Sequence, residues 1–356
     1  MGSLLELLTK IYIPGKKICI SPRGIYTVLM NILIGCKKDT RDKIKDILGI
    51  FGNYIPIAEK SEFYTYSCDN RDELINESVM LIEKGYPVRK DFINSSIDIF
   101  NTKVIHFEEE EDIVEKVKKW VTLSTRGLIK DFDPSLGEDT RLAIINLVYF
   151  KSKWKYPFDP DLTSKLPFNK YDGSIIMIDT MIMYNTSYYY KRDEDMKSKI
   201  IMLEYEDYRF VMFIVIPDTV TGIDTVVSHF KDVNIINRMI SKKDMIYTEM
   251  NLYLPRFEIE DEQNLGDALI NMGCEDLFKN GELSGISDVK TLRMSSIKQK
   301  SILKVDESGT EASSVTEVYV TDGISNTIEV HADMPFMCLI SDIQTKIPLF
   351  VGIFQG

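Results

Sequence analysis

Helical periodicity dominates the first third of the chain. Residues 21–36 (SPRGIYTVLMNILIGC) begin with serine and proline, which suit a helix N-cap and first turn, and continue apolar to a glycine that can end the helix. Residues 39–49 form a second capped segment that also ends at glycine, and residues 109–127 place apolar side chains on one face, with acids early and lysines late. These patterns predict three amphipathic helices.

The rest of the chain switches mainly to strand-like patterns. Residues 264–278 return to helical spacing, and residues 334–356 predict two buried strands joined by a polar turn. Helices first, then many strands without regular βαβ alternation, predict an α+β fold built around large mixed β-sheets. No linker or repeat precedes Glu307, so we expect a single domain over residues 1–356. Runs rich in β-branched and aromatic residues occur at 141–150, 174–184, 186–192, 208–217 and 250–260.

Composition limits the classes of partner. The 356 residues are 44% hydrophobic and 28% charged, which is typical of a globular protein with a sizeable core. A net charge of −12 argues against a nucleic-acid partner, because phosphates would be repelled. No run of eighteen apolar residues predicts a membrane span. We therefore expect neither nucleic acid nor membrane as a partner.

Cysteine usage and the N-terminal sequence indicate a compartment. The five cysteines are odd in number and widely spaced, without a CxxC pair, which favours reduced thiols over a disulfide framework. The start of the chain lacks the basic residues and long apolar run of a secretory signal. Together these features predict a cytoplasmic protein.

Enzyme motifs are missing from the sequence. It contains no Walker loop, GxGxxG, HExxH or GxSxG pattern. The three histidines, His106, His229 and His331, are far from any cysteine in sequence, so a Cys–His or Ser–His pair stays open only as a spatial arrangement. We expect no catalytic residue, no metal and no cofactor.

The segment ESGTEASSVTEVYVTDGISNT, residues 307–327, is small, polar and rich in β-formers, and it lies between two strongly apolar segments. Alternate positions from Thr310 to Val320 carry small or β-branched side chains, whereas the other positions suit an exposed face. The segment could therefore become a strand with one buried face. On this pattern alone, an ordinary edge strand or exposed loop is an equal alternative.

Several long motifs in order along the chain resemble the serpin family. They are ISPRGIYTVLMNILIGCKKDT, INLVYFKSKWKYPFDPDLTSKLPF, LYLPRFEIEDEQNLGDALINMGCEDLF, VDESGTEASSVT and ADMPFMCLI…LFVGIF. Two residues depart from the motifs of the family: Gly24 replaces a usual serine, and Gln299 stands where many serpins carry histidine. Both departures concern the opening of the sheet. In its free cysteines and its missing secretory signal, the chain is similar to intracellular poxviral serpins of the cytokine response modifier A type.

The resemblance implies a serpin fold whose exposed reactive-centre loop spans about residues 307–330. A protease would cleave this loop, which would then insert into the central sheet and distort the trapped enzyme. The small inward-facing positions favour an inhibitor, and a non-inhibitory serpin acting as a binding protein is the alternative. The implied hinge and insertion residues are Glu307, Gly309, Thr310, Glu311, Ala312, Ser314 and Thr316.

The register of the loop leaves two candidate positions for the scissile bond. In most serpins it would place Gly323 before the bond, whereas the register of the caspase-inhibiting poxviral serpins selects Asp322–Gly323. The preceding Tyr319, Val320 and Thr321 make YVTD, which resembles the YVAD-type peptide that inflammatory caspases prefer. Aspartate at this place requires a basic pocket in the protease.

The resemblance thus implies a monomeric protease inhibitor that serves viral immune evasion and acts in the host cell cytoplasm. Its best target is a caspase-1-like enzyme, a thiol protease, and granzyme B is a serine protease alternative. Such an inhibitor would block inflammation or apoptosis.

Overall fold

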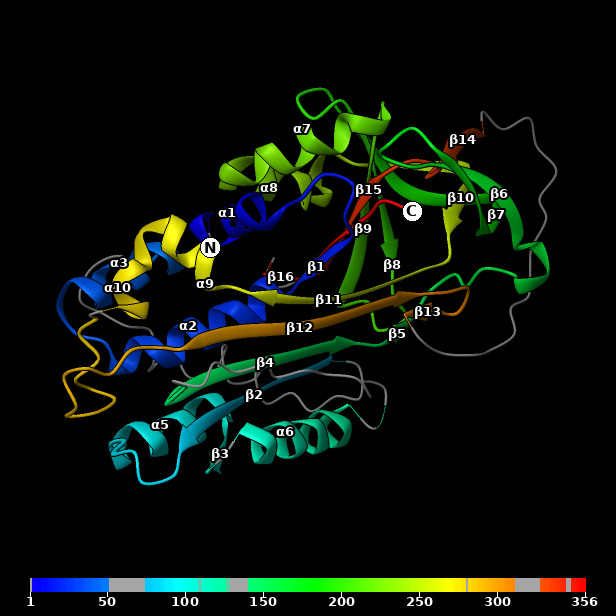
Figure 1. The fold of residues 1–356 in the computed structure, drawn as a ribbon. Helices are drawn as coiled ribbons and strands as arrows, with labels where there is room; N and C mark the ends of the chain where they lie inside the picture. Colours follow the sequence, from blue (N-terminus) through cyan, green and yellow to red (C-terminus); the bar gives the residue numbers. More distant parts are fainter. Residues whose placement is uncertain are drawn as a thin grey trace. The chain divides into compact units, whose positions relative to one another are not determined.

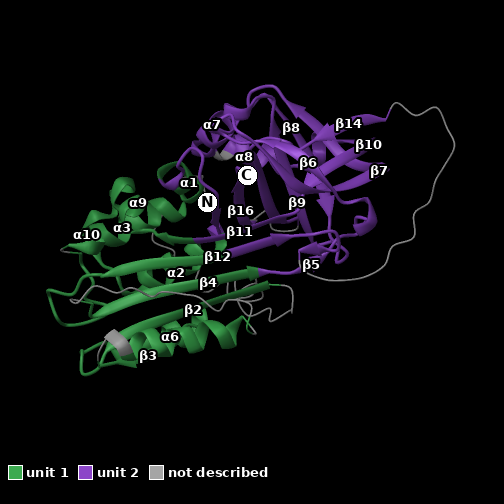
Figure 2. Cartoon of the chain, turned by 45° about the vertical axis from the view of Figure 1, so that its right-hand side comes forward, with its two compact units in different colours: residues 1–10, 23–149, 262–301 green, residues 11–22, 150–261, 302–356 purple. Residues whose placement is uncertain are grey.

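The computed structural model describes residues 2–50, 74–108, 110–125, 127, 140–279, 281–310, 327–343 and 347–356 (Figure 1). The chain divides into two compact units (Figure 2). Unit 1 comprises residues 1–10, 23–149 and 262–301, and unit 2 comprises residues 11–22, 150–261 and 302–356. The interpretation of residues 1–356 as a single domain stays a prediction.

The helices predicted near the N-terminus are present. The predicted glycine stop of the second lies just after its last turn, because Gly49 has the left-handed φ of 69° that terminates helices. Helix α2 is buried on nearly all sides, whereas α3 and α5 alternate buried and exposed positions, as an amphipathic period requires. The helices are α1 (Gly2–Ile11), α2 (Pro22–Gly35), α3 (Lys38–Leu48), α5 (Lys90–Phe100) and α6 (Glu110–Ser124).

A five-stranded sheet has the order β11-β12-β4-β2-β3. All nine residues of β4 are buried, which explains why residues 142–150 are apolar apart from Asn146. Strands β2 and β3 pair in parallel. The strands are β2 (Leu74–Glu83), β3 (Lys103–Phe107), β4 (Leu142–Phe150), β11 (Phe257–Asn264) and β12 (Ser296–Val305).

A nine-stranded sheet has the order β1-β16-β15-β9-β8-β7-β10-β14, with β6 paired to β7. The pair β10–β14 is parallel and the pairs described along the rest of this order are antiparallel, so the predicted α+β fold with mixed sheets is confirmed. The strands are β1 (Ile18–Ile20), β6 (Ser164–Asn169), β7 (Ile175–Asp193), β8 (Ser198–Glu204), β9 (Phe210–Pro217), β10 (Ile246–Pro255), β14 (Ile328–His331), β15 (Phe336–Asp342) and β16 (Ile347–Phe354).

Two predicted boundaries differ from the structure. The runs expected as separate strands at 174–184 and 186–192 form the single strand β7, because Asn185, with φ of 48°, is absorbed as a bulge opposite the register shift in β10. The helix expected over residues 264–278 is interrupted at Gly273, whose φ of 92° separates α9 (Gly266–Leu269) from α10 (Glu275–Phe278). Unit 2 adds the short helices α7 (Ile223–Ser228) and α8 (Val233–Met239).

Candidate functional site: the base of the reactive loop

Three of the predicted hinge residues lie within the described part of the chain. They are Glu307, Gly309 and Thr310, and all three are in unit 2. The other predicted site residues fall in residues 311–326, outside the described ranges: Glu311, Ala312, Ser314, Thr316, Tyr319, Val320, Thr321, Asp322 and Gly323.

The chain reverses direction immediately after β12. The backbone N–H of Asp306 donates to the Gly309 carbonyl at 2.9 Å, and the Gly309 N–H donates back to the Asp306 carbonyl at 3.2 Å. The Asp306 carboxylate accepts hydrogen bonds from the N–H and hydroxyl of Ser308 at 3.0 and 2.7 Å. Gly309 has φ of +147°, and a Cβ there would lie 2.2 Å from the Ser152 carbonyl oxygen. Only glycine fits this turn.

After the turn, the hinge begins a new strand. Strand β13 (Gly309–Thr310) pairs antiparallel with β5 (Ser152–Lys153), and β5 follows β4 after one intervening residue. The Trp154 backbone N–H donates to the Ser308 carbonyl at 3.0 Å, and its indole N–H donates to the Asp306 carbonyl at 3.0 Å. The tryptophan of the KSKWK motif therefore holds both sides of the turn.

The side chain of Thr310 is completely buried in unit 2. Its hydroxyl shares a hydrogen bond of 3.0 Å with the Tyr205 hydroxyl. The Tyr205 ring, also fully buried, stacks on Trp154 with centroids 4.6 Å apart and an interplanar angle of 11°. No sequence motif marks Tyr205, although its position just beyond the buried strand β8 is a weak signal for an inward-facing aromatic.

An ion pair anchors the first hinge residue. Glu307, with a side chain only 9% exposed, contacts the Arg256 guanidinium and accepts a hydrogen bond from the Thr163 hydroxyl at 2.6 Å. Burial alone would raise the pKa of Glu307, but the hydrogen bonds from Arg256 and Thr163 outweigh it and lower the pKa below its ordinary value. Arg256 and Thr163 are hinge-contacting residues that sequence reasoning missed.

The far end of the predicted loop is also fixed in unit 2. The Thr327 hydroxyl donates to the Glu249 carboxylate at 2.7 Å, and β14 then pairs in parallel with β10 (Figure 1). Residues 311–326 are thus bounded by two hydrogen-bonded strands, β13 and β14.

The two departures from the serpin motifs, Gly24 and Gln299, meet within unit 1. The Gln299 side-chain amide donates to Asn146 Oδ1 at 2.9 Å, linking β12 to β4. The Asn146 amide donates in turn to Ser78 Oγ at 3.1 Å on β2. A Cβ on Gly24 would lie 2.2 Å from Asn146 Oδ1 and 2.8 Å from Gln299 Nε2. The glycine in α2 therefore makes room for the glutamine in β12.

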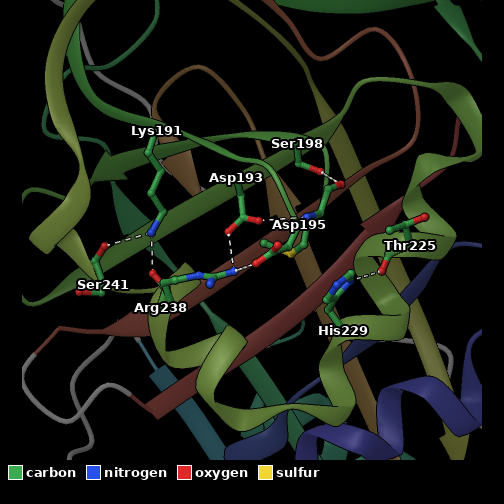
Figure 3. A network of polar contacts seen from close by, with 9 residues as sticks. Lys191, Asp193, Asp195, Ser198, Thr225, His229, Arg238 and Ser241 are labelled. Atoms are coloured by element: carbon green, nitrogen blue, oxygen red, sulfur yellow. Dashed lines mark hydrogen bonds and ion pairs between the residues drawn. The ribbon is translucent and has the colours of Figure 1, made fainter.

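A second dense group of polar side chains joins β7 to α8 in unit 2 (Figure 3). The Lys191 ammonium donates to the backbone carbonyls of Arg238 at 2.5 Å and Ser241 at 3.4 Å. The Arg238 guanidinium pairs with Asp193 at 3.4 Å and Asp195 at 2.5 Å. Burial lowers the pKa of Lys191, although Asp193 opposes this. Lys191 binds carbonyls at the C-terminal end of α8, and Arg238 ties the same helix to Asp193 and Asp195. A structural role therefore explains this cluster.

Within the described ranges, no group of three or more histidine, cysteine, aspartate or glutamate side chains is arranged to hold a metal ion. None of the helices described in the structure is long and apolar enough to cross a membrane. Four cysteines, Cys19, Cys36, Cys274 and Cys338, are buried free thiols.

Comparisons with known proteins agree with this geometry. Residues 3–355 match the family model for serpins, described as serine protease inhibitors. A fowlpox virus protein named as an uncharacterized serpin-like protein, FPV010, is 65% identical over the full length of both chains. The leukocyte elastase inhibitor of Xenopus laevis is 27% identical, covering 94% of this chain and 92% of that protein.

Solved structures show the same fold. Serpin48 of the insect Tenebrio molitor has a TM-score of 0.86 at 24% identity, covering 100% of this chain and 95% of that one. Human thyroxine-binding globulin has a TM-score of 0.87 at 23% identity, covering 100% of this chain and 98% of that one. The family model, the full-length viral relative and the hinge turn after β12 agree, and the chain belongs to the serpin family.

Proposed function

We propose that this serpin is a suicide inhibitor of Asp-directed proteases, which acts by inserting its reactive loop into the five-stranded sheet. The observation that carries the proposal is the antiparallel pairing of β13 with β5. The hinge has already turned back and runs along the strand that continues β4, so further residues of the loop would extend a strand that has begun.

The sequence of the loop suits this extension. Thr310 is already buried, and the next residues of the same parity, Ala312, Ser314 and Thr316, are small enough to face a sheet interior. Strands β12 and β4 are neighbours in the sheet, and the hinge leaves from the end of β12. A strand added between them would break the β12–β4 pairing and replace it with two new pairings, so the sheet would gain main-chain hydrogen bonds overall.

The chemistry of trapping requires one cleavage. The protease nucleophile attacks the Asp322 carbonyl carbon and forms an acyl-enzyme, while the bond to Gly323 breaks and the new amino group of Gly323 takes up a proton. Loop insertion would then carry the acylated protease away from Gly323 before water can release it. The inhibitor itself contributes no catalytic group.

The preferred scissile bond is Asp322–Gly323. The carboxylate of Asp322 suits the arginine-lined pocket of an Asp-directed protease, and the small Gly323 suits the position after the bond. Tyr319 favours a caspase-1-like enzyme over granzyme B, which prefers a β-branched residue there. The viral relative at 65% identity supports a role in the host cell cytoplasm, where caspases act.

A direct experiment is incubation with a caspase-1-like enzyme and with granzyme B, followed by mass spectrometry of the released C-terminal peptide. We expect a peptide that begins at Gly323, a covalent complex with the protease, and a large rise in the thermal unfolding temperature of the cleaved serpin. A peptide that begins at Ile324 would instead show that Gly323 precedes the scissile bond.

The second candidate function is that of a non-inhibitory serpin acting as a binding protein. Thyroxine-binding globulin, which shares the fold, was solved complexed with thyroine, so this fold also serves binding proteins. Cleavage without any rise in thermal stability, and without a covalent complex, would support this function over inhibition.

A further inference from the structure

The sheet surface beside β14 lies within reach of any protease bound at the loop. Five residues, 323–327, lie between Asp322 and Ile328, the first residue of β14, so an extended chain of six Cα–Cα steps spans at most about 20 Å between them. A protease domain of ordinary size has a diameter of roughly 40 Å. A protease that attacks Asp322 must therefore place part of its surface close to β14 and its neighbour β10.

The exposed face of this strand pair is aromatic. Leu252 and its register partner Val330 point inward and are buried, so the adjacent pair Tyr253 and His331 lies on the opposite face. The Tyr253 and His331 rings stack with centroids 4.1 Å apart and an interplanar angle of 5°. Tyr184 of β7, which is 45% exposed, meets Tyr253 edge-on with centroids 6.4 Å apart.

A small recess opens beside the stacked rings, with a volume of about 190 Å³. Its lining includes Pro167 and Phe168 of β6, both rings of the stacked pair, and Asp333. This volume is below the roughly 300–1,000 Å³ of small-molecule sites, so the recess is better matched to one side chain of a partner protein.

Two carboxylates give this face its charge. Asp333 is the only carboxylate that lines the recess, and Glu329, with a side chain 52% exposed, accepts a hydrogen bond from the neutral Asn251 amide at 2.6 Å. In the described part of the chain, neither carboxylate forms an ion pair with a lysine or arginine. Carboxylates beside aromatic rings are the groups that recognise a guanidinium.

We infer that this face, defined by Tyr184, Tyr253, Glu329, His331 and Asp333, is a docking surface for the target protease. The inference rests on the proposed function. An arginine on the protease surface places its stem in the recess against the rings and its guanidinium at the carboxylates. The contact lies outside the loop, so it selects among proteases that share the same preference for aspartate.

The test compares association rates of inhibition. The variant Glu329→Gln/Asp333→Asn removes the two negative charges with little change in shape. We expect its second-order rate constant with the inhibited protease to fall about tenfold at low salt, with a weaker salt dependence than the parent, because rim charges act mainly on association. The cleavage site and the stoichiometry of inhibition should be unchanged.

A matched control, Asp98→Asn/Glu258→Gln, removes the same charge from two other exposed positions. A second variant, Tyr184→Ser, tests the aromatic part of the face and should lower the rate constant several-fold. If the parent inhibits an Asp-directed protease but Glu329→Gln/Asp333→Asn associates as fast as the control, the docking surface is refuted and the proposed function stands. If the parent forms no covalent complex with any such protease, the proposed function itself fails.

Discussion

Replacing Gly24 by alanine tests the packing of α2 against the polar side chains that link β12 and β4. In an ordinary helix interior, this change would stabilise the protein by about 1 kcal/mol, because alanine loses less backbone entropy than glycine. Here the added Cβ would lie 2.2 Å from Asn146 Oδ1, 2.8 Å from Gln299 Nε2 and 2.8 Å from Val148 Cγ2. The Asn146 amide must move, and its hydrogen bonds to Gln299 and Ser78 must lengthen or break.

The expected magnitude follows from these contacts. Overpacking of a well-ordered interior costs about 1–3 kcal/mol. Losing one buried hydrogen bond costs about 1 kcal/mol more, and the gain in helix propensity offsets a similar amount. We expect Gly24→Ala to lower the free energy of unfolding by about 2 kcal/mol. For a chain of this length, the unfolding temperature should fall by about 3 °C.

The assay is thermal unfolding followed by circular dichroism, with two further variants. Gly266→Ala is the matched control, because the nearest atom to the added Cβ is Asn264 Oδ1 at 3.2 Å, a side-chain atom that needs to shift by only a few tenths of an ångström. It should be neutral or slightly stabilising. Gln299→Ala removes one of the crowded groups and frees the Asn146 amide to rotate. The double variant Gly24→Ala/Gln299→Ala should therefore lose about 1 kcal/mol less than the two single losses combined.

Two results would refute this reasoning. The first is a Gly24→Ala variant as stable as the Gly266→Ala control, which would mean that the Asn146 amide relaxes without cost. The second is strict additivity in the double variant, which would mean that Gly24 and Gln299 do not share the same space.

Three further predictions concern the loop and its hinge. Asp322→Ala should abolish inhibition of caspases, because the arginine pocket of the protease loses its partner at a cost of several kcal/mol; inhibition kinetics equal to those of the parent would contradict this. Thr310→Arg should turn the inhibitor into a substrate, because an unpaired guanidinium cannot occupy the buried site beside Tyr205. A gel that compares the amount of cleaved, released serpin with the amount of trapped protease complex decides this. Efficient trapping by the variant would favour inhibition by simple tight docking. Glu307→Gln should lower the free energy of unfolding by about 1 kcal/mol at pH 7, a small value because Arg256 is half-exposed. The folded-state pKa of Glu307 is lowered, so its contribution to stability is present above the ordinary value of 4.5 and is lost as pH falls through the lowered pKa. The stability difference between parent and variant in urea unfolding should therefore shrink as pH is lowered from 7 to below 4.5. A difference that stays constant would argue against the ion pair.

The sequence by itself determined the elements whose signal is local. The apolar period and terminal glycines of residues 21–36 and 39–49 predict α2 and α3 because helix formation depends on neighbours three and four residues apart. The run rich in β-branched and aromatic residues at 141–150 predicts a strand, which is β4. The ordered motifs then identified the family, since together they cover the length of the chain.

Only the tertiary structure decided which residues meet at the hinge. Tyr205, Arg256 and Thr163 are 51 to 144 residues away from their partners in sequence, and no local pattern marks them as hinge contacts. The same holds for Gly24, whose lack of a side chain has meaning only because the folded chain brings Asn146 and Gln299 against it. Sheet pairing joins strands that are distant in sequence, so the contacts of the predicted hinge depend on register and packing, which no local window contains.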